Sequence, residues 1–253
     1  LNREGDGLRQ SLIPGLISQV QSHANRQYKS CRFFEIGTVF STDNSELGAT
    51  HLAAVLAGQV HNQDWYADAR TYDFYDIKGI VESLCAAVDV KVVFKPIRNS
   101  LLHPAMGLEI WDSKGAIGSL GIVRPDCFRS SPSMPCAAVF EIKLPSLQKK
   151  LPKHYHHFSK YPKITRHLSL QMRTDVMYDE IRRIIDQVAS DILVREYLFD
   201  LFTPTEDSQV TKRLGLGLEF QSAKQTLSDH EVDRVVTTIK DALFEQLKIE
   251  VRH

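Results

Sequence analysis

Four aspartates among aromatic residues are the first candidates for chemistry in this chain of 253 residues. They lie in the segment DWYADARTYDFYD as Asp64, Asp68, Asp73 and Asp76. Paired carboxyl groups act as general acid and base in hydrolases, but no characteristic spacing joins these four into such a pair. Acidic residues also gather at helix N-termini, where the helix dipole stabilises them. A hydrolase is therefore an alternative interpretation, and it requires a deep pocket that raises the pKa of one carboxyl group.

Three histidines in the segment HYHH suggest a metal site, because imidazole is a common zinc ligand. These are His154, His156 and His157, and the segment contains no cysteine and no clear fourth ligand. We therefore predict no metal site here. The chain also contains no P-loop motif and no GxSxG motif, so the usual sequence signals of a nucleotide hydrolase or a serine hydrolase are missing.

The overall composition gives little support to a highly charged partner or a membrane. Lys plus Arg and Asp plus Glu both number 31, so any basic surface must be local. No apolar run approaches the roughly 20 residues of a membrane span, and no signal peptide opens the chain. Since the first residue is Leu, we expect a piece of a longer protein. Reduced, mostly buried thiols are expected, because Cys31, Cys85, Cys127 and Cys136 form no C-x-x-C pair and are widely spaced.

Residue periodicity predicts an α+β protein with two domains. Residues 1–150 are typical of a mainly antiparallel sheet with two or three helices, two of them at 11–25 and 73–88. Residues 151–161 are rich in proline and basic residues, which indicates a linker. Strands of the first domain are expected at 32–40, 51–60, 91–97, 106–112, 116–123 and 137–144.

The second domain, 162–253, follows the order β-α-β-β-α-β, which is the ferredoxin-like arrangement. Ser228 and Glu231 have the spacing of a capping box at the start of its second helix. Both helices of this fold pack on one face of the sheet, so the other face is open unless a partner covers it. Strands are expected at 166–172, 193–202, 211–220 and 247–252, and helices at 177–189 and 228–246.

Side chains of a strand alternate between the two faces, so the residues of the open face can be predicted. Leu168, Leu170 and Met172 are expected to face the helices, as are the alternating leucines of 211–220. In 193–202 the pattern is less regular, and we expect Leu193, Tyr197, Phe199 and Leu201 to face the helices. The open face is then predicted to carry His167, Ser169, Gln171, Glu196, Leu198, Asp200, Phe202, Arg213, Gly215, Gly217, Lys248, Glu250 and Arg252.

This predicted face has the chemistry to hold an unpaired nucleic-acid base. Two neighbouring glycines are expected to leave a flat patch, beside which Phe202 offers an aromatic ring. Residues 158–253 contain slightly more acidic than basic residues, which argues against wrapping of a long duplex and favours a small, local contact. A solvated or protein-covered sheet face is the alternative. The predicted RNA-binding residues are Lys160, Arg166, Asp200, Phe202, Lys212, Arg213, Gly215 and Gly217.

Several segments in colinear order resemble the β subunit of bacterial phenylalanyl-tRNA synthetase. In the first half they are LRQSLIPGLISQVQSHANRQYKSCRFFEIGTVF, DFYDIKGIVESL and IGSLGIVRPD. In the second half, SKYPKITRHLSLQM resembles the opening of that family's ferredoxin-fold anticodon-binding domain. The likeness continues through LFDLF, KRLGLGLEFQ and TLSDHEVDRVV and so covers nearly the whole chain.

The resemblance implies a class II synthetase-like module without catalysis, followed by a domain that docks on the anticodon stem-loop of tRNA-Phe. It also implies a cytoplasmic (αβ)2 heterotetramer whose α subunit attaches phenylalanine using ATP and Mg²⁺, with no cofactor bound by this chain and no membrane contact. The chain alone is expected to be inactive as an enzyme. Consistently, no G-x-G-x-x-R motif occurs, and Arg32 and Glu35 are one residue too far apart for a class II phosphate site.

Two departures from the family pattern concern the predicted base contact. The family's F-D-x-Y motif, which the resemblance implies supplies an aspartate and a stacking ring, reads Phe199-Asp200-Leu201-Phe202. Phenylalanine keeps the stacking surface and loses the hydroxyl group. Arg213 stands where the family has a small hydroxyl residue, and arginine can contact a phosphate or stack on a base.

Overall fold

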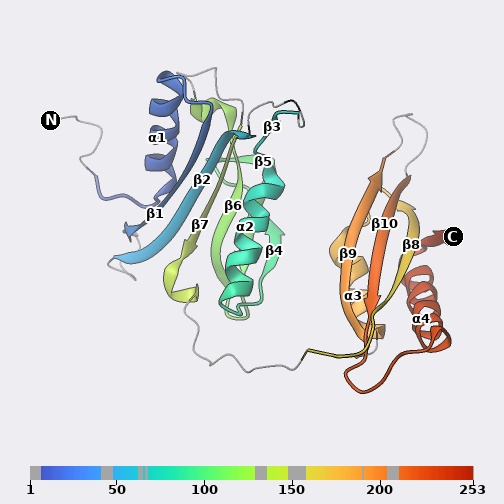
Figure 1. Cartoon of the computed structure of the whole chain (residues 1–253). Coiled ribbons are helices and arrows are strands. Elements are labelled where there is room, and N and C mark those ends of the chain that lie inside the picture. Colours follow the sequence, from blue (N-terminus) through green and yellow to red (C-terminus); the bar gives the residue numbers. More distant parts are fainter. Residues whose placement is uncertain are drawn as a thin grey trace. The chain divides into compact units, whose positions relative to one another are not determined.

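The computed structural model describes residues 7–40, 48–61, 65, 68–128, 136–147, 158–189, 191–203 and 211–252. The chain forms two compact units, Leu1–Pro152 and Lys153–His253, and each is described by itself (Figure 1). The predicted linker, 151–161, lies largely outside the described residues, as do Asp64 and the three histidines of HYHH. In the part of the chain that is described, no helix combines the length and apolarity needed to cross a membrane.

The first unit is built on a seven-stranded sheet in which all pairings are antiparallel. Its strand order is β1-β2-β7-β6-β5-β4, and the short β3 pairs with β2. The turn DSKG joins β5 to β6, and Asp112 stabilises it by accepting hydrogen bonds from the backbone N–H groups of Lys114 and Gly115. The strands are β1 Ser30–Val39, β2 Ala49–His61, β3 Arg70–Thr71, β4 Val93–Pro96, β5 Leu102–Trp111, β6 Ala116–Val123 and β7 Ala137–Lys143.

Two helices cover opposite faces of this sheet. Helix α1 (Ile13–Asn25) packs against Ala53, Val55 and Ala57 of β2. Helix α2 (Phe74–Ala87) packs on the other side, where Leu56 of β2 and Phe140 of β7 lie in its hydrophobic core. Because β7 is buried on both faces, its sequence AAVFEI reads as a continuous apolar run interrupted only by Glu141. Two short 3-10 helices, Pro125–Phe128 and Leu144–Leu147, flank β7 in the sequence.

The second unit has the predicted β-α-β-β-α-β order. Its sheet has the strand order β11-β8-β10-β9, and all three pairings are antiparallel. Figure 1 shows α3 and α4 on one side of this sheet, while the other side of β9 and β10 carries no helix. The elements are β8 Ile164–Arg173, α3 Tyr178–Val188, β9 Leu193–Phe202, β10 Thr211–Phe220, α4 Asp229–Leu247 and β11 Glu250–Arg252.

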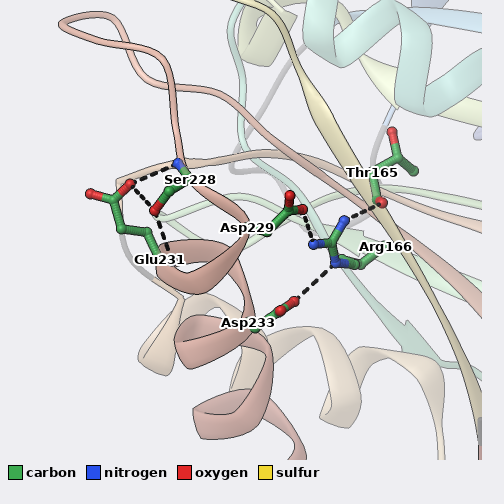
Figure 2. A network of polar contacts seen from close by, with 6 residues as sticks. All are labelled: Thr165, Arg166, Ser228, Asp229, Glu231 and Asp233. Carbon is green, nitrogen blue, oxygen red and sulfur yellow. Dashed lines mark hydrogen bonds and ion pairs between the residues drawn. The ribbon is translucent and has the colours of Figure 1, made fainter.

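The alternation predicted for β8 and β10 is confirmed. Leu168, Leu170 and Met172 of β8 are at most 4% exposed, and they form one core with the leucines of β10 and the apolar faces of α3 and α4. The predicted capping box of α4 is also present, since the Ser228 side chain accepts a hydrogen bond from the N–H of Glu231, and the Glu231 carboxylate accepts one from the N–H of Ser228 (Figure 2). This helical layer fixes which face of the sheet remains open.

Candidate nucleic-acid interface

Strand β9 contains an irregularity at Phe199 that the sequence pattern does not reveal. Phe202 lies opposite Arg213 of β10 and Asp200 lies opposite Gly215, but the next pair is Leu198 with Leu216. Phe199 is therefore an extra residue without a register partner, as in a β-bulge. A bulge of this kind reverses the alternation of the strand, so the faces predicted for Glu196, Tyr197, Leu198 and Phe199 are wrong.

The bulge places two rings of β9 over the glycines of β10. A Cβ atom at Gly215 would lie 2.7 Å from Cε2 of Phe199, and one at Gly217 would lie 2.6 Å from Cε2 of Tyr197. Both glycines are buried under these rings. The prediction of a flat, bare glycine patch is therefore wrong, because the chain's own aromatic side chains occupy it. The absence of Cβ atoms in β10 provides the space for the two rings.

Glu196 consequently faces helix α3 rather than the open side. Its carboxylate lies 3.2 Å from Nε of Arg182, and its side chain is 14% exposed. Burial raises the pKa of Glu196, an effect that the neighbouring charge of Arg182 opposes. Burial, together with the charge and hydrogen bond of Glu196, also raises the pKa of Tyr178 on α3. This contact fixes the part of β9 that precedes the bulge.

The open face contains a cavity of about 460 Å³. Its walls come from three strands, β8, β9 and β10, so it is formed entirely by the second unit. Two phenylalanine rings lie at this cavity with much of their surface free: Phe199 is 53% exposed and Phe202 is 55% exposed. The lining residues are His167, Leu168, Ser169, Phe199, Asp200, Phe202, Arg213, Leu214 and Gly215.

A small aromatic cluster supports one wall of this cavity. The ring centroids of His167 and Phe199 are 5.0 Å apart, and those of Tyr197 and Phe199 are 6.5 Å apart. His167 Nε2 also lies 3.2 Å from the Tyr197 hydroxyl oxygen, within hydrogen-bonding distance. The Arg195 guanidinium lies 5.1 Å from the centroid of the Tyr197 ring. These contacts hold the Phe199 ring against the sheet and leave its outer surface exposed.

Four of the predicted RNA-binding residues meet at this cavity. They are Asp200, Phe202, Arg213 and Gly215, although Gly215 lies beneath the Phe199 ring and offers no surface of its own. Asp200, a hydrogen-bond acceptor, and Arg213, a donor, are both exposed. Gly217 lies beneath Tyr197 beside the cavity. A ring, an acceptor and a donor on one exposed face are the groups that recognise an unpaired base.

The other three predicted residues lie elsewhere. Lys212 is opposite Met172 on the helix side, and its ammonium group donates hydrogen bonds to the carbonyl oxygens of Thr174 (3.1 Å) and Val176 (2.6 Å). It thereby holds the connection between β8 and α3. Lys160 precedes β8, and its Nζ lies 5.5 Å from the centroid of the Tyr161 ring. Neither lysine lines the cavity.

Arg166 binds the start of α4 instead of the open face (Figure 2). It forms ion pairs with Asp229 and with Asp233, the latter at 3.0 Å from Nε. Hydrogen bonds to these two carboxylates raise the pKa of Arg166. The predicted RNA-binding role of Arg166 disagrees with this position, because its guanidinium group is engaged between β8 and α4. Strand alternation explains the disagreement, since Arg166 has the same parity as the buried Leu168.

Sequence reasoning missed Phe199 and Tyr197 as open-face residues and left His167 out of the predicted site. The glycine pair in LGLG carried a signal that was available. Glycines at alternate positions of one strand leave space on one face, and an aromatic side chain of the neighbouring strand commonly fills such a space. The segment YLFDLF supplies these rings.

The two aspartates of the acidic segment that lie at the start of helix α2, Asp73 and Asp76, are engaged in structural hydrogen bonds. Asp73 is the N-cap of α2, and its Oδ1 accepts hydrogen bonds from the N–H groups of Tyr75 and Asp76. The hydrogen bonds from Arg70 lower the pKa of Asp76, the reverse of the raised pKa that the hydrolase interpretation predicts. Within the described ranges, no cluster of three or more His, Cys, Asp and Glu side chains has a geometry that suits a metal ion.

Strand β1, whose sequence resembles part of a class II phosphate site, does not bring Arg32 and Glu35 together. Arg32 and Glu35 are three residues apart on β1, so their side chains point to opposite faces of the sheet. The Glu35 carboxylate forms an ion pair with Arg9. These two residues therefore do not form a joint site for a nucleotide phosphate.

Comparisons with known proteins match both units. The family model described as "Phenylalanyl tRNA synthetase beta chain CLM domain" matches residues 1–144. The family model described as "Ferredoxin-fold anticodon binding domain" matches residues 159–252. The first match covers more than half of the chain, and the two together leave only residues 145–158 and 253 unmatched.

Individual relatives agree with these matches. The phenylalanine–tRNA ligase beta subunit of Coxiella burnetii is 28% identical over 256 residues, which cover 100% of this chain and 32% of the relative. The beta subunit of Pseudoalteromonas translucida is 29% identical and that of Buchnera aphidicola subsp. Acyrthosiphon pisum 31%, over 98% and 90% of this chain. They are covered over 32% and 30% of their own lengths. The chain thus spans about a third of the length of these relatives, and it belongs to the phenylalanyl-tRNA synthetase beta chain family.

Proposed function

We propose that the second unit binds the anticodon stem-loop of tRNA-Phe through the open face of its sheet. The observation that carries this proposal is the cavity of about 460 Å³, where exposed phenylalanine rings adjoin the carboxylate of Asp200 and the guanidinium of Arg213. The match to a ferredoxin-fold anticodon-binding domain over residues 159–252 supports the same ligand.

Each of the exposed groups has a distinct role in this proposal. An unpaired base stacks on the Phe202 ring, which needs no hydroxyl group for this contact. Asp200 accepts hydrogen bonds from N–H groups at the edge of a base. Arg213 lies directly opposite Phe202 and donates to a phosphate of the loop. Because Lys212 and Arg166 are engaged on the helix side, they are not part of the proposed site.

We also propose that the chain acts within the beta subunit of a phenylalanine–tRNA ligase and supports its assembly with an alpha subunit in an (αβ)2 heterotetramer. The alpha subunit then performs aminoacylation with ATP and Mg²⁺ in the cytoplasm, while this chain performs no catalysis. The opposed directions of Arg32 and Glu35 support this division of labour. We take 1–150 as the catalytic-like domain, 151–161 as the linker and 162–253 as the anticodon-binding domain.

Titration of the 253-residue chain with a tRNA-Phe transcript tests the proposed ligand. Replacing Phe202→Ala is expected to weaken binding about 5- to 150-fold, the effect of losing one stacked base. Phe244→Ala is the matched control, because Phe244 is 53% exposed but lies on α4. Equal affinities of the wild-type chain and Phe202→Ala would contradict the proposal and favour a structural module whose open face is covered by protein.

A further inference from the structure

Phe199 and Phe202 both lie at the cavity, but they occupy different places on the sheet. Phe202 is opposite Arg213, whereas the Phe199 ring reaches over Gly215, with its Cε2 and Cζ atoms 2.7 and 2.9 Å from the position of an added Cβ. The Phe199 ring therefore lies along the sheet surface above β10. Asp200 lies between the two phenylalanines in the sequence and on the same face.

The bulge is the physical reason why both rings share this face. In a regular strand, Phe199 and Phe202 are three residues apart and point to opposite sides of the sheet. The extra residue places Phe199 beside Asp200 instead. A residue that only filled space above Gly215 would be largely covered, yet Phe199 is 53% exposed while its inner surface is supported by the His167 ring at 5.0 Å.

We propose that Phe199 is a second stacking surface, so that the cavity binds two consecutive unpaired bases of an RNA loop. This inference rests on the proposed function of the site. One base stacks on Phe202 and the adjacent base stacks on Phe199, and the Asp200 carboxylate lies between them as a shared hydrogen-bond acceptor. Two platforms fit a splayed single strand, since successive bases of unpaired RNA stack separately on aromatic side chains of open sheet faces.

A cycle that removes one ring and one base at a time tests this arrangement. The probes are tRNA-Phe anticodon stem-loops in which a single loop nucleotide is abasic, scanned across the loop. The proteins are the 253-residue chain, Phe199→Ala, Phe202→Ala and the control Phe244→Ala. Affinity is measured for each pair by fluorescence anisotropy at fixed salt, because phosphate contacts depend on ionic strength.

The proposal predicts that each ring is coupled to a different base. With the intact loop, Phe199→Ala and Phe202→Ala each weaken binding about 5- to 150-fold. One abasic position abolishes the effect of Phe199→Ala alone, and the adjacent abasic position abolishes the effect of Phe202→Ala alone. Coupling of both rings to the same base would overturn the inference and show a single base held between them.

The outcomes also separate this inference from the proposed function. If Phe202→Ala weakens binding and Phe199→Ala does not, the site binds RNA but the second platform is refuted. If neither variant differs from Phe244→Ala, the RNA-binding function itself is refuted. Phe199→Leu shows whether a loss of RNA affinity comes from a disturbed sheet surface or from the missing aromatic ring. Leucine fills the space above Gly215 without an aromatic face, so the proposal predicts that this variant binds RNA as weakly as Phe199→Ala. Wild-type affinity of Phe199→Leu would overturn the inference.

Discussion

Lys212 and Arg213 are adjacent basic residues on opposite faces of β10, and we predict that they have opposite phenotypes. Lys212→Met should lower the free energy of unfolding of the second unit and leave RNA affinity unchanged. Arg213→Met should weaken RNA binding and leave stability nearly unchanged. The reason is that the Lys212 ammonium group donates to two backbone carbonyl oxygens, whereas Arg213 is exposed at the cavity.

The magnitude for Lys212 follows from these two hydrogen bonds. A hydrogen bond to a charged group contributes about 1.5–3 kcal/mol when shielded, but one of these bonds is exposed to solvent and the other only partly buried. Solvent screening places the expected loss near about 1–2 kcal/mol. Methionine retains the apolar part of the side chain, so the loss isolates the ammonium group.

Urea unfolding followed by circular dichroism measures this loss, with RNA titration on the same samples. Both tryptophans, Trp65 and Trp111, belong to the first unit, so their fluorescence serves as an internal control that should not change. A variant Lys212→Met of wild-type stability with weakened RNA binding would refute the assignment of the two faces.

Three further predictions follow from the second unit. Glu196→Gln should be more stable than the wild type at neutral pH, because burial raises the pKa of Glu196 and so disfavours its charged form in the folded state. This difference in stability should vanish as the pH falls below both the raised pKa and the ordinary pKa of a glutamate, and urea midpoints between pH 3 and 8 measure it. Ser228→Ala should destabilise α4 by about 1 kcal/mol through loss of its cap, measured by hydrogen exchange of its first turn; an unchanged exchange rate would contradict the capping role. Gly217→Val should displace the Tyr197 ring and remove its hydrogen bond to His167, visible as altered ring resonances; unchanged Tyr197 resonances would show that the space above Gly217 is not filled by this ring.

The order and type of the elements of the second unit could be predicted because local and tertiary preferences agree. The alternation of Leu214, Leu216 and Leu218 predicts a strand with one buried face, and all three residues are at most 5% exposed. Ser228 and Glu231 likewise mark the start of α4 through their spacing alone.

The faces of β9 could not be predicted from parity, because one additional residue reverses the alternation. The bulge at Phe199 goes with the space above Gly215 and with the position of Glu196 beside Arg182 of α3, both of which arise only when strands and helix are assembled. The apolar residues of YLFDLF occur on both parities, so the pattern itself does not favour one register.

Two basic residues of the predicted site, Arg166 and Lys212, lie on the helix side of the sheet for a related reason. A sequence pattern shows that Arg166 is charged, but it does not show that Asp229 and Asp233 lie within reach across the sheet–helix boundary. Long cationic side chains on the helix side of a sheet extend past the apolar core to its rim. Arg166 and Lys212 both do so, and both are engaged by groups of their own unit.

We propose that the open face of the second unit, and not its helical face, binds the anticodon loop. Nuclear magnetic resonance of selectively labelled phenylalanine rings, followed during titration with the tRNA-Phe anticodon stem-loop, tests it most directly. We predict that the ring resonances of Phe199 and Phe202 shift, while those of Phe244 on α4 and of the buried Phe220 stay in place. Shifts at Phe244 with unperturbed Phe199 and Phe202 would contradict the claim.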